Sequence, residues 1–224
     1  TRENIAPGDS AELALSTQRI AFTTDSFVVS PLFFPGGDIG TLAVFGTAND
    51  LVVSGARPRW ISLSLIIEEG LPLSVLTRVL ESVARSARTI DVDDGTGDTK
   101  VVPVSAADGL FINTSGIGEL VDPVPPGPQS LEVGDELILT GPAGCHGVSI
   151  LAAREGIEFQ PPPSSDCRPL LAAADALREA EIPVKAMRDA TRVFLATRDG
   201  ESEGHDFLFY LWDPVEVRDL LGDD

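Results

Sequence analysis

The strongest constraint on the fold is a hydrophobic period that alternates, along the first half of the chain, between that of a strand and that of a helix. Residues 19–30 and 60–67 are rich in β-branched, aromatic and aliphatic side chains, and each segment predicts a strand. Residues 39–54 and 72–87 carry apolar side chains at helical spacing, and Asp38 is the natural N-cap of the first helix. This order predicts an α/β domain whose helices pack on a sheet.

A proline-rich segment divides the chain into two parts. Residues 121–130 contain four prolines and one glycine, a composition typical of a linker. We therefore expect one domain over residues 1–120 and a second α/β domain over residues 131–224. The remaining elements are predicted at residues 98–104, 109–117 and 135–140 for strands and at residues 146–154 and 169–180 for helices.

The charge balance excludes two classes of partner. The 224 residues carry 16 cationic and 35 anionic side chains, a net charge of −19 that repels nucleic acids and anionic membranes. The two lysines are Lys100 and Lys185, and this composition fits either a halophilic cytoplasm or an ordinary acidic surface. Two cysteines, no leader-like start and no apolar stretch of about 18 residues predict a cytoplasmic protein without a membrane span.

Asp50 is the most informative acidic residue, because it lies within the apolar helical run of residues 39–53. An isolated carboxylate is costly to bury in such a run. Helical spacing places Thr47 and Ser54 on the same face as Asp50. This polar stripe predicts either a contact with a polar ligand or metal ion, or the solvated face of an amphipathic helix.

Other acids lie at the edges of apolar elements. Asp9 lies in the loop-like sequence PGDSA, and Asp25 interrupts the first strand; each is alternatively a surface acid. Asp98 and Lys100 fall on one side of an extended segment, which suits a site for Mg²⁺ and phosphate but also an exposed ion pair. Oxygen ligands without a cluster of His or Cys favour Mg²⁺ over zinc.

Seven motifs in a fixed order resemble the HypE family of hydrogenase maturation factors. They are AFTTDSFVVSPLFFPGGDIGTLAVFGTANDL, EEGLPL, TGDTKVV, DGLFINTSGIG, GCHGVSILAAREG, SDCRPL and KAMRDATR, which cover most of residues 21–192. This family is similar to aminoimidazole ribonucleotide synthetase, selenophosphate synthetase and thiamine monophosphate kinase. The resemblance implies an α/β (α+β) fold, in which a PurM-like N-terminal domain contributes a mainly antiparallel sheet to a dimeric β-barrel and precedes a truncated second domain.

The same resemblance implies that ATP and Mg²⁺ bind between the two domains. The implied metal ligands are Asp9, Asp25, Asp50 and Asp98, and the implied catalytic residues are Asp50 and Lys100. Asn49 would position the nucleotide or the metal ion, Lys100 would contact the phosphates or the transferring group, and Asp189 would face the same cleft.

The implied activity is that of a carbamoyl dehydratase, which uses ATP to convert a protein-bound thiocarboxamide into a thiocyanate for the cyanide ligands of nickel–iron hydrogenase. The implied partners are a second copy of the chain, the carbamoyltransferase HypF and the HypC–HypD complex. After MRDATR the chain departs from the family, because an acidic segment follows and no terminal cysteine is present, so we expect a truncated member that is an enzyme of this type by descent, if not in full activity. The alternatives are another ATP-dependent phosphotransferase or synthetase on this scaffold and a non-catalytic dimerisation module.

Overall fold

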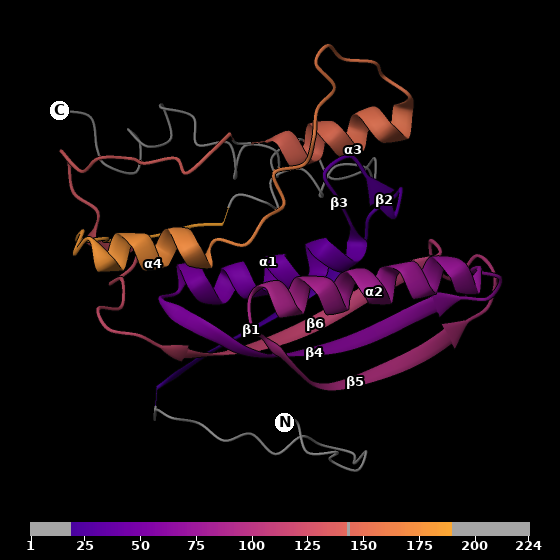
Figure 1. Cartoon of the computed structure of the whole chain (residues 1–224), viewed down its shortest axis with the longest axis horizontal. Helices are drawn as coiled ribbons and strands as arrows, with labels where there is room; N and C mark the ends of the chain where they lie inside the picture. Colours follow the sequence, from indigo (N-terminus) through magenta and orange to yellow (C-terminus); the bar gives the residue numbers. More distant parts are fainter. Residues whose placement is uncertain (1–18, 143, 190–224) are drawn as a thin grey trace.

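The structure is a computed structural model that describes residues 19–142 and 144–189 (Figure 1). Its strands are β1 (Ile20–Phe27), β2 (Phe33–Phe34), β3 (Gly37–Asp38), β4 (Ala56–Glu68), β5 (Asp93–Val102) and β6 (Leu110–Leu120). Its helices are α1 (Ile39–Val53), α2 (Leu73–Thr89), α3 (Cys145–Glu155) and α4 (Leu171–Glu179), with a 3-10 turn η1 (Pro128–Ser130). Among these residues no helix combines the length and the apolar character that a membrane crossing requires.

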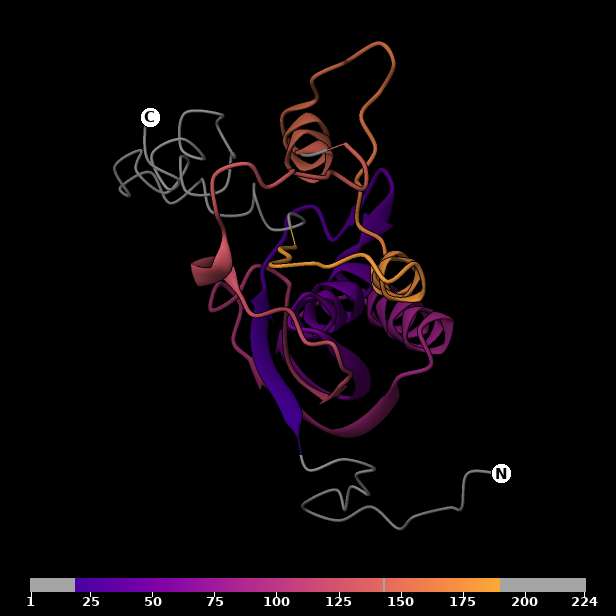
Figure 2. The same ribbon diagram turned by 90° about the vertical axis from the view of Figure 1, so that its left-hand side faces the viewer.

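Four strands form one sheet in the order β1-β6-β4-β5. Strand β6 pairs antiparallel with β1 and β4, whereas β5 pairs parallel with β4, because α2 carries the chain back between them. The predicted mainly antiparallel sheet is therefore confirmed. Helices α1 and α2 lie on the same side of this sheet (Figure 2).

Helix α1 begins where the sequence predicts, because Asp38 caps it. The Oδ1 atom of Asp38 accepts a hydrogen bond from the backbone N–H of Thr41 at 2.9 Å, and its Oδ2 atom accepts one from the Ser82 hydroxyl of α2 at 2.7 Å. Twelve of the fifteen residues of α1 are buried, so the helix is covered on most of its circumference. It is the central element against which the sheet, α2 and the second half of the chain pack.

The apolar spacing of α2 predicts a stripe facing the sheet that consists of Leu73, Leu76, Val79, Leu80, Val83, Ala84 and Ala87. Val79 is fully buried, and Leu76, Val83 and Ala87 pack against the core. Leu80 is 39% exposed, and Leu73, in the first turn, is 76% exposed. The predicted stripe was too wide, because consecutive helical residues are about 100° apart and the contact is a narrow band centred on Val79.

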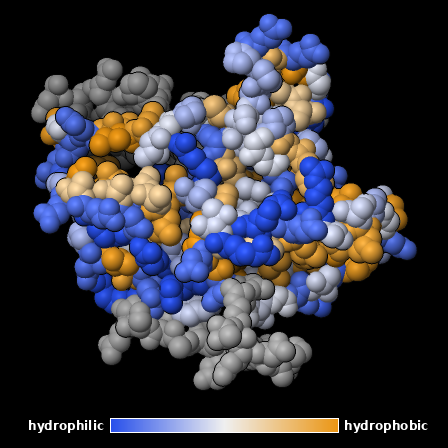
Figure 3. Space-filling view, in the orientation of Figure 1, coloured by the Kyte–Doolittle hydropathy of each residue, from blue (hydrophilic) through white to orange (hydrophobic). Residues whose placement is uncertain are grey.

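The predicted strand at residues 135–140 is wrong. Residues 135–139 are assigned neither helix nor strand, and no described segment pairs with them. Their apolar side chains lie in solvent, with Leu137, Ile138 and Leu139 each more than 60% exposed. Figure 3 shows hydrophobic side chains gathered over this part of the surface, at the upper left. The sequence has the composition of a strand, but a strand also requires a hydrogen-bonded neighbour.

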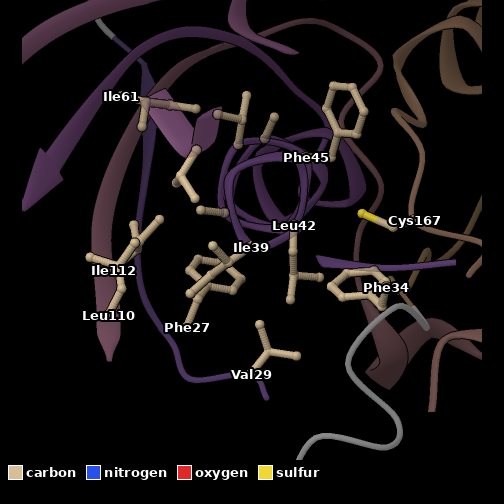
Figure 4. Close-up of a cluster of buried hydrophobic side chains, with 14 of the residues drawn as sticks. Phe27, Val29, Phe34, Ile39, Leu42, Phe45, Ile61, Leu110, Ile112 and Cys167 are labelled. Carbon is tan, nitrogen blue, oxygen red and sulfur yellow. The ribbon is translucent and has the colours of Figure 1, made fainter. Parts of the chain in front are cut away.

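The main hydrophobic core lies between α1 and the sheet and extends to the second half of the chain (Figure 4). Ile39, Leu42 and Phe45 of α1 belong to this cluster. Its other labelled members are Phe27, Val29, Phe34, Ile61, Leu110, Ile112 and Cys167. Cys167 is 7% exposed, so its thiol is part of the core.

The second half of the chain is fixed to the first by a close backbone contact at the β2–β3 turn. The N–H of Ser165 donates to the carbonyl of Pro35 at 2.8 Å. A Cβ atom on Gly36 would lie 2.6 Å from the Ser165 nitrogen, and Gly36 has a φ of +88°, so only glycine suits this position. The ring of His146 packs edge-on against Phe34 at 5.2 Å between centroids. Helix α3 is thereby held against the hairpin.

Candidate functional site

The polar stripe of α1 is buried against the sheet at Thr47 and reaches the surface at Ser54. The Thr47 side chain is completely buried and shares a hydrogen bond with the Thr114 hydroxyl of β6. One turn later, Asp50 is half-buried, and its Oδ2 atom accepts a hydrogen bond from the Thr23 hydroxyl of β1 at 3.0 Å. The interpretation of this stripe as a solvated helix face is therefore wrong for Thr47, whereas Ser54 at the end of the stripe is exposed. Asp50 lies where the end of α1 meets the edge strand of the sheet.

The surroundings of Asp50 disfavour its negative charge. Burial raises the pKa of the Asp50 carboxyl, and the neighbouring negative charge of Asp189 raises it further. The hydrogen bond from Thr23 and the positive charge of Arg188 act in the opposite direction. A bound cation would relieve both the burial and the repulsion, so this environment favours a positively charged ligand beside Asp50.

A cavity of about 480 Å³ opens beside Asp50. Its walls come from β1, the end of α1, the segment at residues 125–128 and residues 186–189. Four residues of the lining interact with one another. The Asp50 carboxylate accepts the hydrogen bond from Thr23 and interacts electrostatically with Arg188 and Asp189. The volume is within the range of small-molecule sites, about 300–1,000 Å³. The cavity is thus formed by both halves of the chain and carries two carboxylates and a guanidinium.

Asn49 does not face this cavity with a free amide. Its Nδ2 atom donates to the carbonyl of Arg168 at 2.9 Å, and its Oδ1 atom accepts from the N–H of Leu170 at 2.9 Å. The side chain is 1% exposed. The sequence assigned Asn49 to the nucleotide or the metal ion, whereas the structure uses both of its polar atoms to hold residues 168–170 against α1.

Asp98 and Lys100 form the predicted pair, with 3.3 Å between Lys100 Nζ and Asp98 Oδ2. Both side chains are mostly exposed. The backbone N–H of Thr99 and then Lys100 lower the pKa of the Asp98 carboxyl. The prediction that the two side chains share one side of the strand is confirmed.

The register places this pair on the face of the sheet opposite to Asp50. Asp98 lies beside Ser64, whereas the adjacent residue Leu65 is buried in the core under the helices. Because side chains alternate between faces, Asp98 and Lys100 point away from α1. Within this chain the structure does not bring Asp98 and Lys100 together with Asp50.

The remaining predicted ligands differ in position. Asp25 is half-buried and lies two residues from Thr23, on the helix-covered face of β1, since its partner in register is the buried Thr114. Asp9 lies outside the described residues. Residues 19–142 and 144–189 contain no group of three or more His, Cys, Asp or Glu side chains that could hold a metal ion by themselves. Mg²⁺ commonly takes only one or two protein carboxylates together with phosphate oxygens, so the pair Asp50 and Asp189 fits that ion.

Sequence reasoning missed Thr23 and Arg188. Thr23 lies in the same motif as Asp25. Its hydrogen bond to Asp50 depends on how β1 packs against α1, and no local sequence pattern indicates that contact. Arg188 lies next to Asp189 in the MRDATR motif, so the motif could have indicated it.

Comparisons with known proteins decide the family. The profile of the AIR synthase related protein N-terminal domain matches residues 7–120, and that of the corresponding C-terminal domain matches residues 132–197. The chain belongs to the AIR synthase-related family. It is 48% identical over 192 residues to carbamoyl dehydratase HypE of Escherichia coli K12, covering 85% of this chain and 56% of that protein. It is 45% identical over 188 residues to HypE of Azotobacter vinelandii, covering 82% and 54%. This family member spans about half the length of the curated relatives it matches.

Solved structures confirm the predicted α/β fold and the resemblance to HypE. The crystal structure of E. coli HypE matches with a TM-score of 0.77 at 48% identity, covering 82% of this chain and 58% of that one. A structure of HypE in complex with ATP matches with a TM-score of 0.72 at 48% identity, covering 76% and 50%. A HypE–HypF complex matches with a TM-score of 0.70 at 43% identity, covering 75% and 55%.

Proposed function

We propose that this chain carries the nucleotide-binding part of a HypE-type carbamoyl dehydratase that acts in the cytoplasm on a step of hydrogenase maturation. In the reaction, ATP phosphorylates the oxygen of a protein-bound thiocarboxamide. This phosphorylation releases ADP, and loss of that oxygen as inorganic phosphate, together with both protons of the nitrogen, then leaves a thiocyanate. Phosphorylation is needed because an amide oxygen is otherwise a poor leaving group. The proposed organisation is a nucleotide-binding domain at residues 1–120, a linker at residues 121–130 and a second domain at residues 131–224.

One observation carries the proposal. In a chain that is 48% identical to a HypE solved with ATP, a half-buried carboxylate, Asp50, lines a cavity between the two halves of the chain. The raised pKa of Asp50 and the nearby Asp189 make the cavity complementary to a cation. A divalent cation that accompanies a nucleotide satisfies this requirement.

The residues have separable proposed roles. Asp50 and Asp189 would hold Mg²⁺, which when bound offsets the charge of the phosphates. Thr23 keeps the Asp50 carboxylate oriented through its hydroxyl. Arg188, which lines the same cavity, is positioned to contact phosphate oxygens. Asp25, on the same strand face as Thr23, would extend the acidic wall.

The open face of the sheet supports a homodimer. No described helix packs on this face, and Phe22 is 65% exposed on it while Ile66 is 38% exposed. A second copy placed there would cover both side chains and bring the Asp98–Lys100 pair into the interface. The assignment of Asp98 and Lys100 to the reaction therefore depends on dimerisation. We also propose HypF as a partner, because a HypE–HypF complex resembles this chain, and the HypC–HypD complex as the acceptor of the product.

Calorimetric titration with Mg²⁺-ATP tests the site directly. We expect the unmodified chain to bind, and Asp50→Asn, which preserves shape but removes the charge, to weaken binding at least about tenfold, the equivalent of about 1.4 kcal/mol. Asp108→Asn is the matched control, because Asp108 is an exposed acid outside the cavity. Equal affinity of Asp50→Asn and Asp108→Asn would remove Asp50 from the site.

A second assay tests the chemistry. The chain is incubated with Mg²⁺-ATP and a synthetic peptide that ends in an S-carbamoylated cysteine. The expected result is loss of the mass of one water from the peptide with one ADP formed per peptide. ADP formation without a change in the peptide would instead favour another ATP-dependent reaction on this scaffold.

A further inference from the structure

Helix α2 presents a long surface to the solvent. Three of its 17 residues are buried, namely Val79, Ser82 and Ser86. Outside this contact the helix carries two exposed leucines, Leu73 at 76% and Leu80 at 39%. Residues seven apart lie almost above one another on a helix, so the two leucines belong to one stripe. Helix α2 therefore has an apolar stripe that its contact with the core does not use.

Positive charge accompanies this stripe, in contrast to the charge of the whole chain. The helix contains three arginines, Arg78, Arg85 and Arg88, and one acid, Glu81, which leaves α2 a net charge of +2. The whole chain has a net charge of −19. All three arginines are exposed. Arg78 is held in position over the Phe33 ring, with 3.7 Å between the guanidinium carbon and the ring centroid.

An open groove of about 410 Å³ lies along the exposed side of α2. Its lining residues all belong to this helix and recur at helical spacing: Thr77, Leu80, Glu81, Ala84, Arg85 and Arg88. In Figure 3 the surface over α2 carries hydrophilic and hydrophobic side chains next to each other. The groove shares no lining residue with the cavity beside Asp50, so it is a separate surface.

The chemistry of this surface selects its occupant. The net charge of −19 repels nucleic acids and anionic membranes. A second copy in a twofold contact would place α2 against α2 and set the arginines of the two helices against each other. An acidic amphipathic helix avoids this repulsion, because its carboxylates pair with guanidinium groups while its apolar residues cover the leucines.

We propose that the exposed side of α2 docks an acidic amphipathic helix of a partner protein. Carboxylates of that helix pair with Arg85 and Arg88, and its apolar residues remove Leu73 and Leu80 from water. This docking surface is an addition to the proposed nucleotide-binding function and does not depend on it.

Fluorescence anisotropy of a labelled probe peptide, titrated with the full chain, tests the docking. The probe is a synthetic helix of about 18 residues with leucines at helical spacing and glutamates on both sides of them. A second peptide has glutamine at every glutamate position. We expect the acidic probe to bind at least about tenfold more tightly than the glutamine peptide, and to lose affinity between about 0.05 and 0.5 M NaCl.

Variants of the chain locate the binding surface. The double variant Arg85→Gln/Arg88→Gln and the single variant Leu80→Ser should each weaken binding of the acidic probe at least about tenfold. The double variant Arg19→Gln/Arg59→Gln is the matched control, because it changes the net charge equally at exposed side chains outside α2. The control should keep the affinity within about twofold. Thermal unfolding of each variant reports that the fold is retained.

Four outcomes would overturn the proposal. Equal affinity for the two peptides means that α2 does not recognise carboxylates. An equal loss in both double variants means that the overall charge, and not α2, attracts the probe. Self-association that Arg85→Gln/Arg88→Gln abolishes assigns the surface to a second copy. Tighter probe binding after Asp199→Asn, Glu201→Gln and Glu203→Gln together assigns it to an acidic segment of the chain itself.

Discussion

Replacement of Asn49 by alanine separates two roles for this residue. The sequence assigned its amide to the nucleotide or the metal ion, whereas the structure shows it bonded to the backbone of Arg168 and Leu170, each at 2.9 Å. Asn49→Ala removes both bonds and leaves the N–H of Leu170 and the carbonyl of Arg168 without these partners. The expected effect is therefore on the attachment of residues 168–170 to α1.

The size of the loss follows from burial. Asn49 is 1% exposed, so water cannot easily replace the amide. A hydrogen bond contributes about 0.5–1.5 kcal/mol net, and an unsatisfied buried partner costs about 1–3 kcal/mol. Because Arg168 is exposed and Leu170 only half-buried, their backbone groups recover part of this in water, and we expect a loss of about 2–3 kcal/mol. For a chain of this length that corresponds to a decrease in Tm of about 4–12 °C.

Thermal unfolding and ATP titration of the same samples provide the assay. Asn113→Ala is the matched control, because Asn113 also makes two side-chain hydrogen bonds, donating to the carbonyl of Asp25 and to the Ser26 hydroxyl, but from a half-buried position on the sheet. We expect the control to cost about 1 kcal/mol or less, since water can replace its bonds. The reasoning is refuted if Asn49→Ala melts like the unmodified chain, or if it loses Mg²⁺-ATP affinity without losing stability.

Two further predictions concern buried titratable groups. Burial lowers the pKa of His146 below its ordinary 6.5, so the neutral ring stabilises the fold. The contribution of His146 to the free energy of unfolding is complete above pH 6.5, the ordinary pKa of histidine. It declines as the pH falls from 6.5 towards the lower pKa of the folded state. Urea unfolding between about pH 8 and pH 5 should show the decline, and His146→Asn should abolish the His146 contribution to it. Burial also raises the pKa of the Cys167 thiol to about 12, so iodoacetamide at about pH 8 should label Cys145 in the folded chain and Cys167 only after unfolding. Equal labelling of both thiols would contradict the burial.

The elements of the first half were largely predictable because their signals are local. Asp38 caps α1 through the N–H of Thr41, three residues away, and helical spacing identified the run that becomes this helix. Helices α3 and α4 were found in the same way. The segment at residues 135–140 could not be predicted in this way. Its composition is that of a strand, but whether a strand forms depends on a hydrogen-bonded neighbour from elsewhere in the chain.

The candidate site was predictable only in part. A carboxylate inside an apolar helix marked Asp50 from the sequence, and the structure places it at a cavity. Its hydrogen-bond partner Thr23 lies 27 residues away, so no local pattern could associate the two. Asn49 was identified by its motif, but its contacts with residues 168–170 are more than 100 residues away in sequence.

The sequence by itself determined the two helices of the first half, the approximate positions of the four strands of the main sheet, the acidic charge and the kinship with HypE, because each of these is carried by residues near one another or by their order. The tertiary structure decided which acids share a site. The register of β4 and β5 turned Asp98 and Lys100 to the face opposite Asp50. The pairing of β1 with β6 brought Thr23 and Asp25 under α1. A face of a sheet is fixed by pairing between distant strands, and a shift of one residue reverses it, so local sequence does not contain that information.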